Sequence, residues 1–153
     1  MTNEKQKYEE DFDNFLMIMD EQLDALRDDA EKQKVPLDFS LSDLSNLEDL
    51  FDLMAPPDSK EDQSGMVVLF ARHLGEVVRL NYGGQWFLPL DDKKNVNFNK
   101  PVIIGHSPIK GLEFSPIFVI RAYSLRRKKG ILARAVKANV DPTPVDIDHL
   151  LEK

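Results

Sequence analysis

The chain has 153 residues, of which 42% are hydrophobic and 31% are charged, a composition typical of globular proteins and not of disordered chains. The absence of cysteine excludes disulfides, thiolate catalysis and Cys-containing zinc sites. No basic and apolar leader is present, and no apolar run approaches the ~18 residues of a membrane span, so we expect a cytoplasmic protein without a membrane partner.

This length predicts a single domain over residues 1–153. Within it we expect an acidic helical part over 1–55, an α+β part over 66–140, and a tail or short helix over 141–153. Residues 1–65 carry 19 acidic and 6 basic side chains, whereas residues 66–153 carry 8 and 14. The resulting charges of −13 and +6 predict either that the two parts pair with each other within the chain or that they bind a charged partner.

The first predicted helix starts at Tyr8 and ends before Pro36. Its apolar residues recur every three or four positions, as in an amphipathic helix: Phe12, Phe15, Met19, Leu23, Leu26 and Ala30. Acidic residues occupy the other faces, and five of them are candidates for partner binding: Glu10, Asp13, Asp20, Asp24 and Asp28. Solvation alone can explain such a face. The functional alternative is a docking surface for a basic protein.

A second helix is predicted over SLSDLSNLEDLFDLM, and the proline pair that follows ends it. Ser45 and Glu48 have the spacing of a capping box at its N-terminus. Leu44, Leu47, Leu50, Phe51 and Met54 supply its apolar side.

The third predicted helix, MVVLFARHLGEVVRLNY, ends at a glycine pair. We expect Gly83 or Gly84 to adopt the left-handed conformation of a helix C-cap. Gly75 inside the helix costs about 1 kcal/mol relative to alanine, which suggests the close approach of another backbone.

Two short segments, QWFLPL and PVIIG, then predict two antiparallel strands. Pro89 makes the first an edge or bulged strand, and Leu112 with Phe114 suggests a short third one. Trp86 in the first strand is expected to be a core anchor, with an exposed interface residue as the alternative.

Ser115 and Pro116 predict the N-cap and first turn of a further helix, in which Phe118, Ala122 and Leu125 share one face. The competing interpretation is a strand through IFVIRAY, because this segment is rich in β-branched and aromatic residues. The helix is favoured.

ILARAVKAN either continues that helix beyond Gly130 or forms another, and Thr143 with Pro144 predicts a short terminal helix. The predicted fold class is therefore α+β: N-terminal acidic helices, a central helix leading into a two- or three-stranded antiparallel sheet, and C-terminal helices.

The strongest basic feature is the tract from 121 to 137, which contains no acidic residue. Its cations are Arg121, Arg126, Arg127, Lys128, Lys129, Arg134 and Lys137. Such a tract can neutralise phosphates and predicts, as a second choice, a nucleic-acid-associated protein. The alternative is pairing with the acidic helices inside the chain, since a pI near 5.0 disfavours general polyanion binding.

The three histidines, His73, His106 and His149, show no spacing typical of a metal or catalytic site. His73 and Glu76 share a face but supply only two ligands, so we interpret His73 as a hydrogen-bonded structural residue. The paired carboxylates lie on helices that we expect to be solvated, where nothing raises a pKa. We expect neither cofactor nor metal and no enzyme, with an unrecognised active site as the outside alternative.

The segments HLGEVVRLNYGGQWFLP and PVIIGHSPIKGLEFSPIFVIRAY resemble small uncharacterised bacterial proteins of the immunity or accessory type, encoded beside polymorphic toxins. The resemblance covers residues 66–125 and rests on an LGE helix, a glycine-pair turn, a tryptophan strand and a Ser-Pro helix start. Its motif residues are structural: Gly75, Gly83, Gly84, Trp86 and Pro116. It implies a bacterial, non-enzymatic protein. We therefore predict a protein-interaction module of unknown oligomeric state, an immunity-like inhibitor that meets a basic protein.

Overall fold

The computed structural model describes residues 2–141, which form six α-helices and one two-stranded antiparallel sheet. The elements are α1 (Thr2–Met17), α2 (Met19–Lys32), α3 (Asp43–Met54), α4 (Ser64–Tyr82), β1 (Gln85–Phe87), β2 (Val102–Ile104), α5 (Pro116–Arg126) and α6 (Ile131–Val140). The predicted α+β class is confirmed. The terminal helix predicted at Thr143 and Pro144 lies outside the described residues. None of the described helices is long and apolar enough to cross a membrane.

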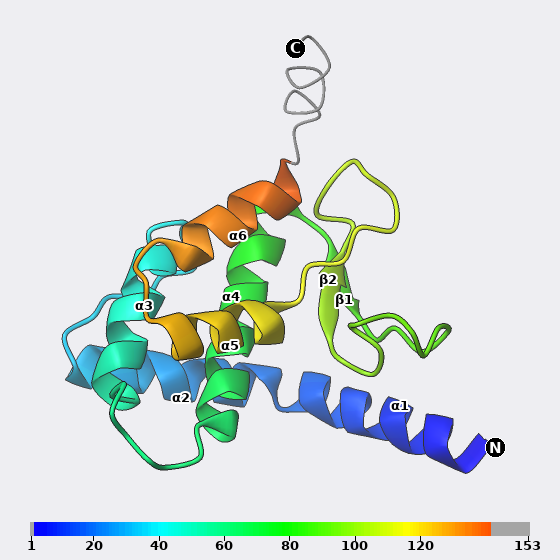
Figure 1. Ribbon diagram of the computed structural model, residues 1–153, viewed down its shortest axis with the longest axis horizontal. Coiled ribbons are helices and arrows are strands. Elements are labelled where there is room, and N and C mark those ends of the chain that lie inside the picture. Colours follow the sequence, from blue (N-terminus) through cyan, green and yellow to red (C-terminus); the bar gives the residue numbers. More distant parts are fainter. Residues whose placement is uncertain (1, 142–153) are drawn as a thin grey trace, which may run out of the picture.

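Helix α4 is the centre of the core, with the other helices and the hairpin around it (Figure 1). Its residues 70 to 78 are all buried, including the polar ones, because neighbours cover every side of the helix. The core cluster draws on α2, α3, α4, α5, α6 and the second strand. Its fully buried members include Leu26, Leu47, Leu50, Phe70, Leu74, Ile103 and Leu132.

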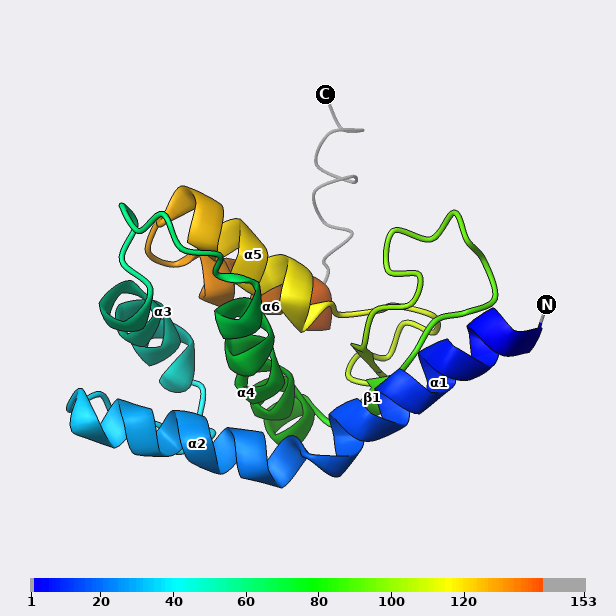
Figure 2. The same cartoon turned by 90° about the horizontal axis from the view of Figure 1, so that it is seen from below.

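The first predicted helix is wrong in one respect, since it is divided at Ile18 into α1 and α2. The two halves pack on different supports. Met19, Leu23, Leu26 and Ala30 of α2 are buried, whereas Phe15 of α1 meets the side of the hairpin. A helix bends where a side chain from a neighbouring element forms a hydrogen bond with its backbone. Here the bend lies between the half that packs on the hairpin and the half that packs on the helical core. Figure 2 shows the result, a bent rod along one side of the molecule.

The glycines beside the hairpin correct two further expectations. Gly75 accommodates the indole ring of Trp86, and not another backbone, since a Cβ there would lie 2.2 Å from the ring. Gly83 caps α4 with φ 91° and ψ −173°, which lies outside the left-handed helical region. Gly84, at φ 101°, passes so close to β2 that a Cβ would lie 2.4 Å from the carbonyl oxygen of Ile104. Both glycines thus adopt conformations that other residues avoid.

The sheet is smaller than its predicted maximum. Trp86 pairs with Ile103, and the first strand ends at Phe87, before the buried Pro89. The predicted third strand is reduced to a single bridge between Ile103 and Phe114.

The segment after Ser115 is helical, and the alternative strand is wrong. Ser115 accepts a hydrogen bond from the Phe118 backbone N–H, with Pro116 at the start of the helix as predicted. The face shared by Phe118 and Leu125 points to solvent, because the core takes the opposite side of the helix, which carries Val119, Ile120 and Tyr123. Arg127, in the left-handed conformation at φ 51°, ends α5 and separates it from α6.

Candidate protein-interaction surface

Helices α1 and α2, residues 2–32, form a rod that we call the acidic rod. It carries eleven acidic and four basic side chains, a net charge of −7. The whole chain also has a net charge of −7, so the rest of the sequence is neutral on balance. Of the charge of −13 on residues 1–65, −7 lies on these two helices, which line one side of the protein (Figure 2), and −6 lies on residues 33–65.

All five predicted partner-binding residues are exposed and lie along the outside of the acidic rod. We call Glu10, Asp13, Asp20, Asp24 and Asp28 the acidic face. Their spacing of three, seven, four and four positions keeps them on one side of a helix. Among the described residues only Asp24 of this set meets a cation, an exposed contact of 4.0 Å with Arg27. Contacts of this kind contribute about 0–1 kcal/mol, so the acidic face is not neutralised from within.

An apolar patch lies at the bend of the rod and was missed from the sequence. Leu16, Met17 and Ile18 are 37%, 77% and 37% exposed. Met17 lies four positions after Asp13 and three before Asp20, which places it in line with the acidic face. That spacing was visible in the sequence, and a methionine within a row of acids was the signal that could have found it.

The rod is fixed to the core by an aromatic and cationic cluster. The ring of Phe15 packs edge-on against Trp86 at 5.1 Å between centroids. The guanidinium of Arg72 lies 4.2 Å from the Phe15 ring centroid and donates from Nη2 to the Phe15 carbonyl oxygen at 3.3 Å. This carbonyl belongs to the last turn of α1, where helices lack internal donors. Arg72 therefore caps the last turn of α1, next to the bend of the rod, and burial lowers the pKa of its guanidinium.

Trp86 is half-buried and behaves as an anchor between the hairpin, α4 and α1. Its Nε1 donates to Oε2 of Glu76 at 2.8 Å, and Arg79 holds the same carboxylate by two hydrogen bonds. Burial raises the pKa of Glu76, but the hydrogen bonds from Arg79 and Trp86 outweigh it and keep that pKa below its ordinary value. The anchor role predicted for Trp86 thus fits its contacts.

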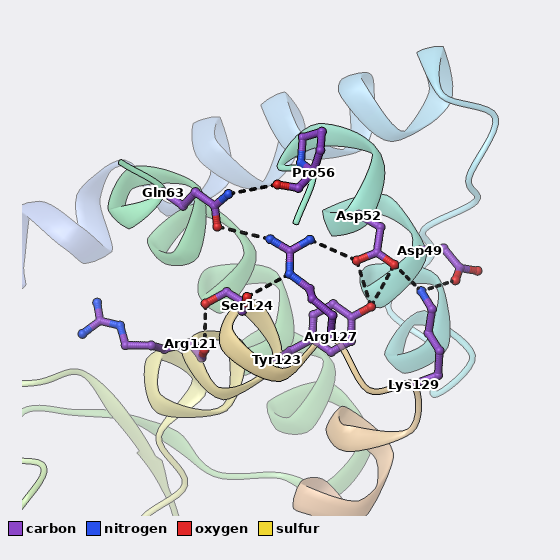
Figure 3. A network of polar contacts seen from close by, with 9 residues as sticks. All are labelled: Asp49, Asp52, Pro56, Gln63, Arg121, Tyr123, Ser124, Arg127 and Lys129. Carbon is purple, nitrogen blue, oxygen red and sulfur yellow. Dashed lines mark hydrogen bonds and ion pairs between the residues drawn. The ribbon is translucent and has the colours of Figure 1, made fainter. Parts of the chain in front are cut away.

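Two cations of the basic tract, Arg127 and Lys129, form ion pairs with carboxylates of α3 (Figure 3). Arg127 donates to Oδ1 of Asp52 at 3.2 Å, and Lys129 donates to Oδ2 of Asp52 at 2.7 Å and to Asp49 at 2.9 Å. The Tyr123 hydroxyl donates to the same Asp52 carboxylate at 2.9 Å. Burial raises the pKa of Asp52, yet the donors from Lys129, Tyr123 and Arg127 hold it below its usual range.

This network joins α3 of the acidic part to the basic tract through Arg127 and Lys129. The remaining cations of the tract are exposed, and within residues 2–141 none of them forms an ion pair. They are Arg121, Arg126, Lys128, Arg134 and Lys137. The acidic rod takes no part in the network either, since both carboxylates come from α3.

Among residues 2–141 three carboxylates are buried, which corrects the expectation that all of them are solvated: Asp43, Glu48 and Glu76. Glu48 does not complete a capping box with Ser45, which lies inside α3. It instead accepts hydrogen bonds from the backbone N–H groups of Gly130 and Leu132, and so caps the N-terminus of α6.

His73 is fully buried and hydrogen-bonded, as interpreted from the sequence. Its Nε2 lies 2.7 Å from Oδ2 of Asp43, which also accepts from the backbone N–H of Phe39. The Phe39 ring stacks on the imidazole at 4.5 Å between centroids. Asp43 thus links His73 of α4 to the backbone of the loop between α2 and α3.

His106 is also buried, and its Nε2 hydrogen-bonds to Oδ1 of Asn139 on α6. Within residues 2–141, no group of three His, Asp or Glu side chains is placed to hold a metal ion.

No protein-family model, curated protein or solved structure matches this chain.

Proposed function

We propose that the chain is a cytoplasmic, non-enzymatic protein-interaction module that binds a basic protein through the acidic face, as an immunity-like inhibitor. The observation that supports this most is the charge of the acidic rod. The rod lies along one side of the protein and carries −7, which equals the net charge of the whole chain. Four of the five acidic-face residues meet no cation among residues 2–141, so their charge is available to a partner.

The chemistry of the rod defines the partner. A complementary surface carries several Lys or Arg side chains and at least one apolar residue that covers Met17. Methionine adapts to irregular apolar surfaces, and charged residues around an apolar centre are a common arrangement of interfaces. The carboxylates would speed association and make it sensitive to salt, because exposed charges are screened beyond ~10 Å at 0.1 M ionic strength.

Binding to nucleic acid through the basic tract is the alternative. Five exposed cations support it. Against it, Arg127 and Lys129 are engaged with α3, and the charge of the acidic rod repels phosphates. A basic protein partner is therefore the better proposal.

Affinity capture with matched charge variants tests the proposal. The wild type, the rod variant Asp13→Lys/Asp20→Lys/Asp28→Lys and a control variant are used as baits with a lysate of the source organism. The control is Asp58→Lys/Glu61→Lys/Asp91→Lys, which makes the same charge change at three exposed carboxylates outside the rod. Far-ultraviolet circular dichroism verifies that each bait is folded.

We expect one basic protein to be retained by the wild type and the control but not by the rod variant. With that protein purified, the rod variant should bind at least about 100-fold more weakly, because opposed like charges cost several kcal/mol at an interface. An immunity-like role further predicts that the wild type, unlike the rod variant, suppresses the partner's activity. Retention of the same proteins by the rod variant would contradict the proposal.

A further inference from the structure

The outer face of α5 is an apolar surface without a partner among the described residues. Phe118 is 62% exposed and Leu125 is 80% exposed, with Ala122 between them in the same row. The opposite side of α5 is buried in the core, so the helix is apolar on both sides. Helices of that kind are normally covered on both sides, and an exposed apolar surface marks a docking site.

The charges around this face define its occupant. Arg121, Arg126 and Lys128 are exposed beside the apolar row, whereas Arg127 and Lys129, from the same tract, are paired with α3. The occupant should therefore present apolar residues flanked by carboxylates. The acidic rod of the same chain cannot be this occupant, because Phe15 and the buried side of α2 hold it elsewhere.

The sequence after α6 has the required chemistry. Residues 142–153 read PTPVDIDHLLEK, with Ile147, Leu150 and Leu151 at a spacing of three and four positions. Such spacing places three apolar side chains on one side of a helix. Asp146, Asp148 and Glu152 lie between and beside them, opposite in charge to the cations of α5.

The segment also starts in the right place. Ala135 and Asn139, near the end of α6, line the same hollow of about 260 Å³ as Phe118 and the exposed Val96. Four extended residues span about 13 Å, and Phe118 and Leu125 are about 10 Å apart along their helix. Residues 146–152 can thus reach the whole apolar row from the end of α6.

From these observations we infer that residues 142–153 dock in cis on the outer face of α5, with Ile147, Leu150 and Leu151 against Phe118 and Leu125 and with the tail carboxylates facing Arg121, Arg126 and Lys128. This site is separate from the acidic rod, so it does not depend on the proposed function. Docking covers the apolar face and makes Arg121, Arg126 and Lys128 less available to polyanions.

Disulfide trapping in the full chain tests the inference, since the natural sequence contains no cysteine. The double variant Leu125→Cys/Leu150→Cys is oxidised mildly at low protein concentration and analysed by mass spectrometry under non-reducing conditions. A disulfide forms readily only if the two Cα atoms come within ~7 Å. The matched control is Leu53→Cys/Leu150→Cys, because Leu53 is 53% exposed on α3.

We expect the Leu125 pair to give an intramolecular disulfide about tenfold faster than the control, since docking raises the effective concentration of the two thiols. Adding Arg121→Glu/Arg126→Glu should reduce that rate at least about threefold, whereas Lys93→Glu/Lys94→Glu, at two exposed lysines, should not. Equal rates for the two pairs would overturn the inference. A disulfide mainly between two molecules would overturn docking in cis and assign the face to a second copy.

Discussion

The replacement Gly75→Ala tests how the hairpin is anchored to α4. The new Cβ would lie 2.2 and 2.3 Å from two ring atoms of Trp86, where ordinary contact begins at 3.4 Å. The ring must therefore retreat by about 1.2 Å, which breaks the hydrogen bond from Nε1 to Glu76. Overpacking costs ~1–3 kcal/mol and a lost hydrogen bond to a carboxylate ~1.5 kcal/mol, against ~1 kcal/mol gained from helix propensity.

The expected net result is a loss of about 2 kcal/mol in the free energy of unfolding, measured by urea denaturation followed by circular dichroism. The emission of Trp86, the only tryptophan, should shift to the red in the folded variant. Gly65→Ala is the matched control, because it lies in the first turn of α4 with nothing within 4 Å of the added Cβ. It should be neutral or stabilising. If Gly75→Ala were as stable as Gly65→Ala, the close packing of Trp86 on Gly75 would be refuted.

Three further predictions concern groups that hold the elements together. Because the pKa of Asp52 is lower when folded than when unfolded, its contribution is full above the unfolded pKa of ~3.9 and is lost as the pH falls through the folded value. The decrease in the free energy of unfolding between pH 5 and pH 3 should thus be smaller in Asp52→Asn than in the wild type. An equal decrease in both would show that the network around Asp52 does not stabilise the fold. Glu48→Ala should cost about 2–4 kcal/mol in urea denaturation, because two backbone donors of α6 lose their acceptor, and Glu48→Gln should cost less; equal stability of the two variants would argue against this cap. Phe15→Ala should speed proteolysis within α1 while leaving the core intact, and unchanged cleavage would show that another contact holds the rod.

The fold followed from local patterns where one periodicity dominated. The regular apolar spacing of α2 and α4 predicted both helices, the Ser115–Pro116 start favoured a helix for α5, and the glycine pair marked the end of α4. The break at Ile18 did not follow, because it coincides with the contact between Arg72 and Phe15, residues 57 positions apart. No window of sequence contains that contact.

The candidate surface was also predicted only where it depends on local patterns, and not where it depends on contacts between distant residues. The exposure of the acidic face follows from amphipathicity, and Met17 could have been found from its place in the same row. The true partners of Glu48 lie 82 and 84 positions away, so its local spacing with Ser45 gave a wrong cap. On α5 both sides are apolar, and the pattern alone could not say which side faces the core.

The most direct test of the central claim places a photo-crosslinking amino acid at Met17, at the middle of the acidic face, in the full-length protein. The matched control carries it at Leu53, which is exposed on α3. If the acidic rod is the binding surface, illumination in cells of the source organism should link one basic protein to position 17 but not to position 53, and the Asp13→Lys/Asp20→Lys/Asp28→Lys background should abolish the link. An adduct at position 53 alone, or one at position 17 that persists in this background, would contradict the account.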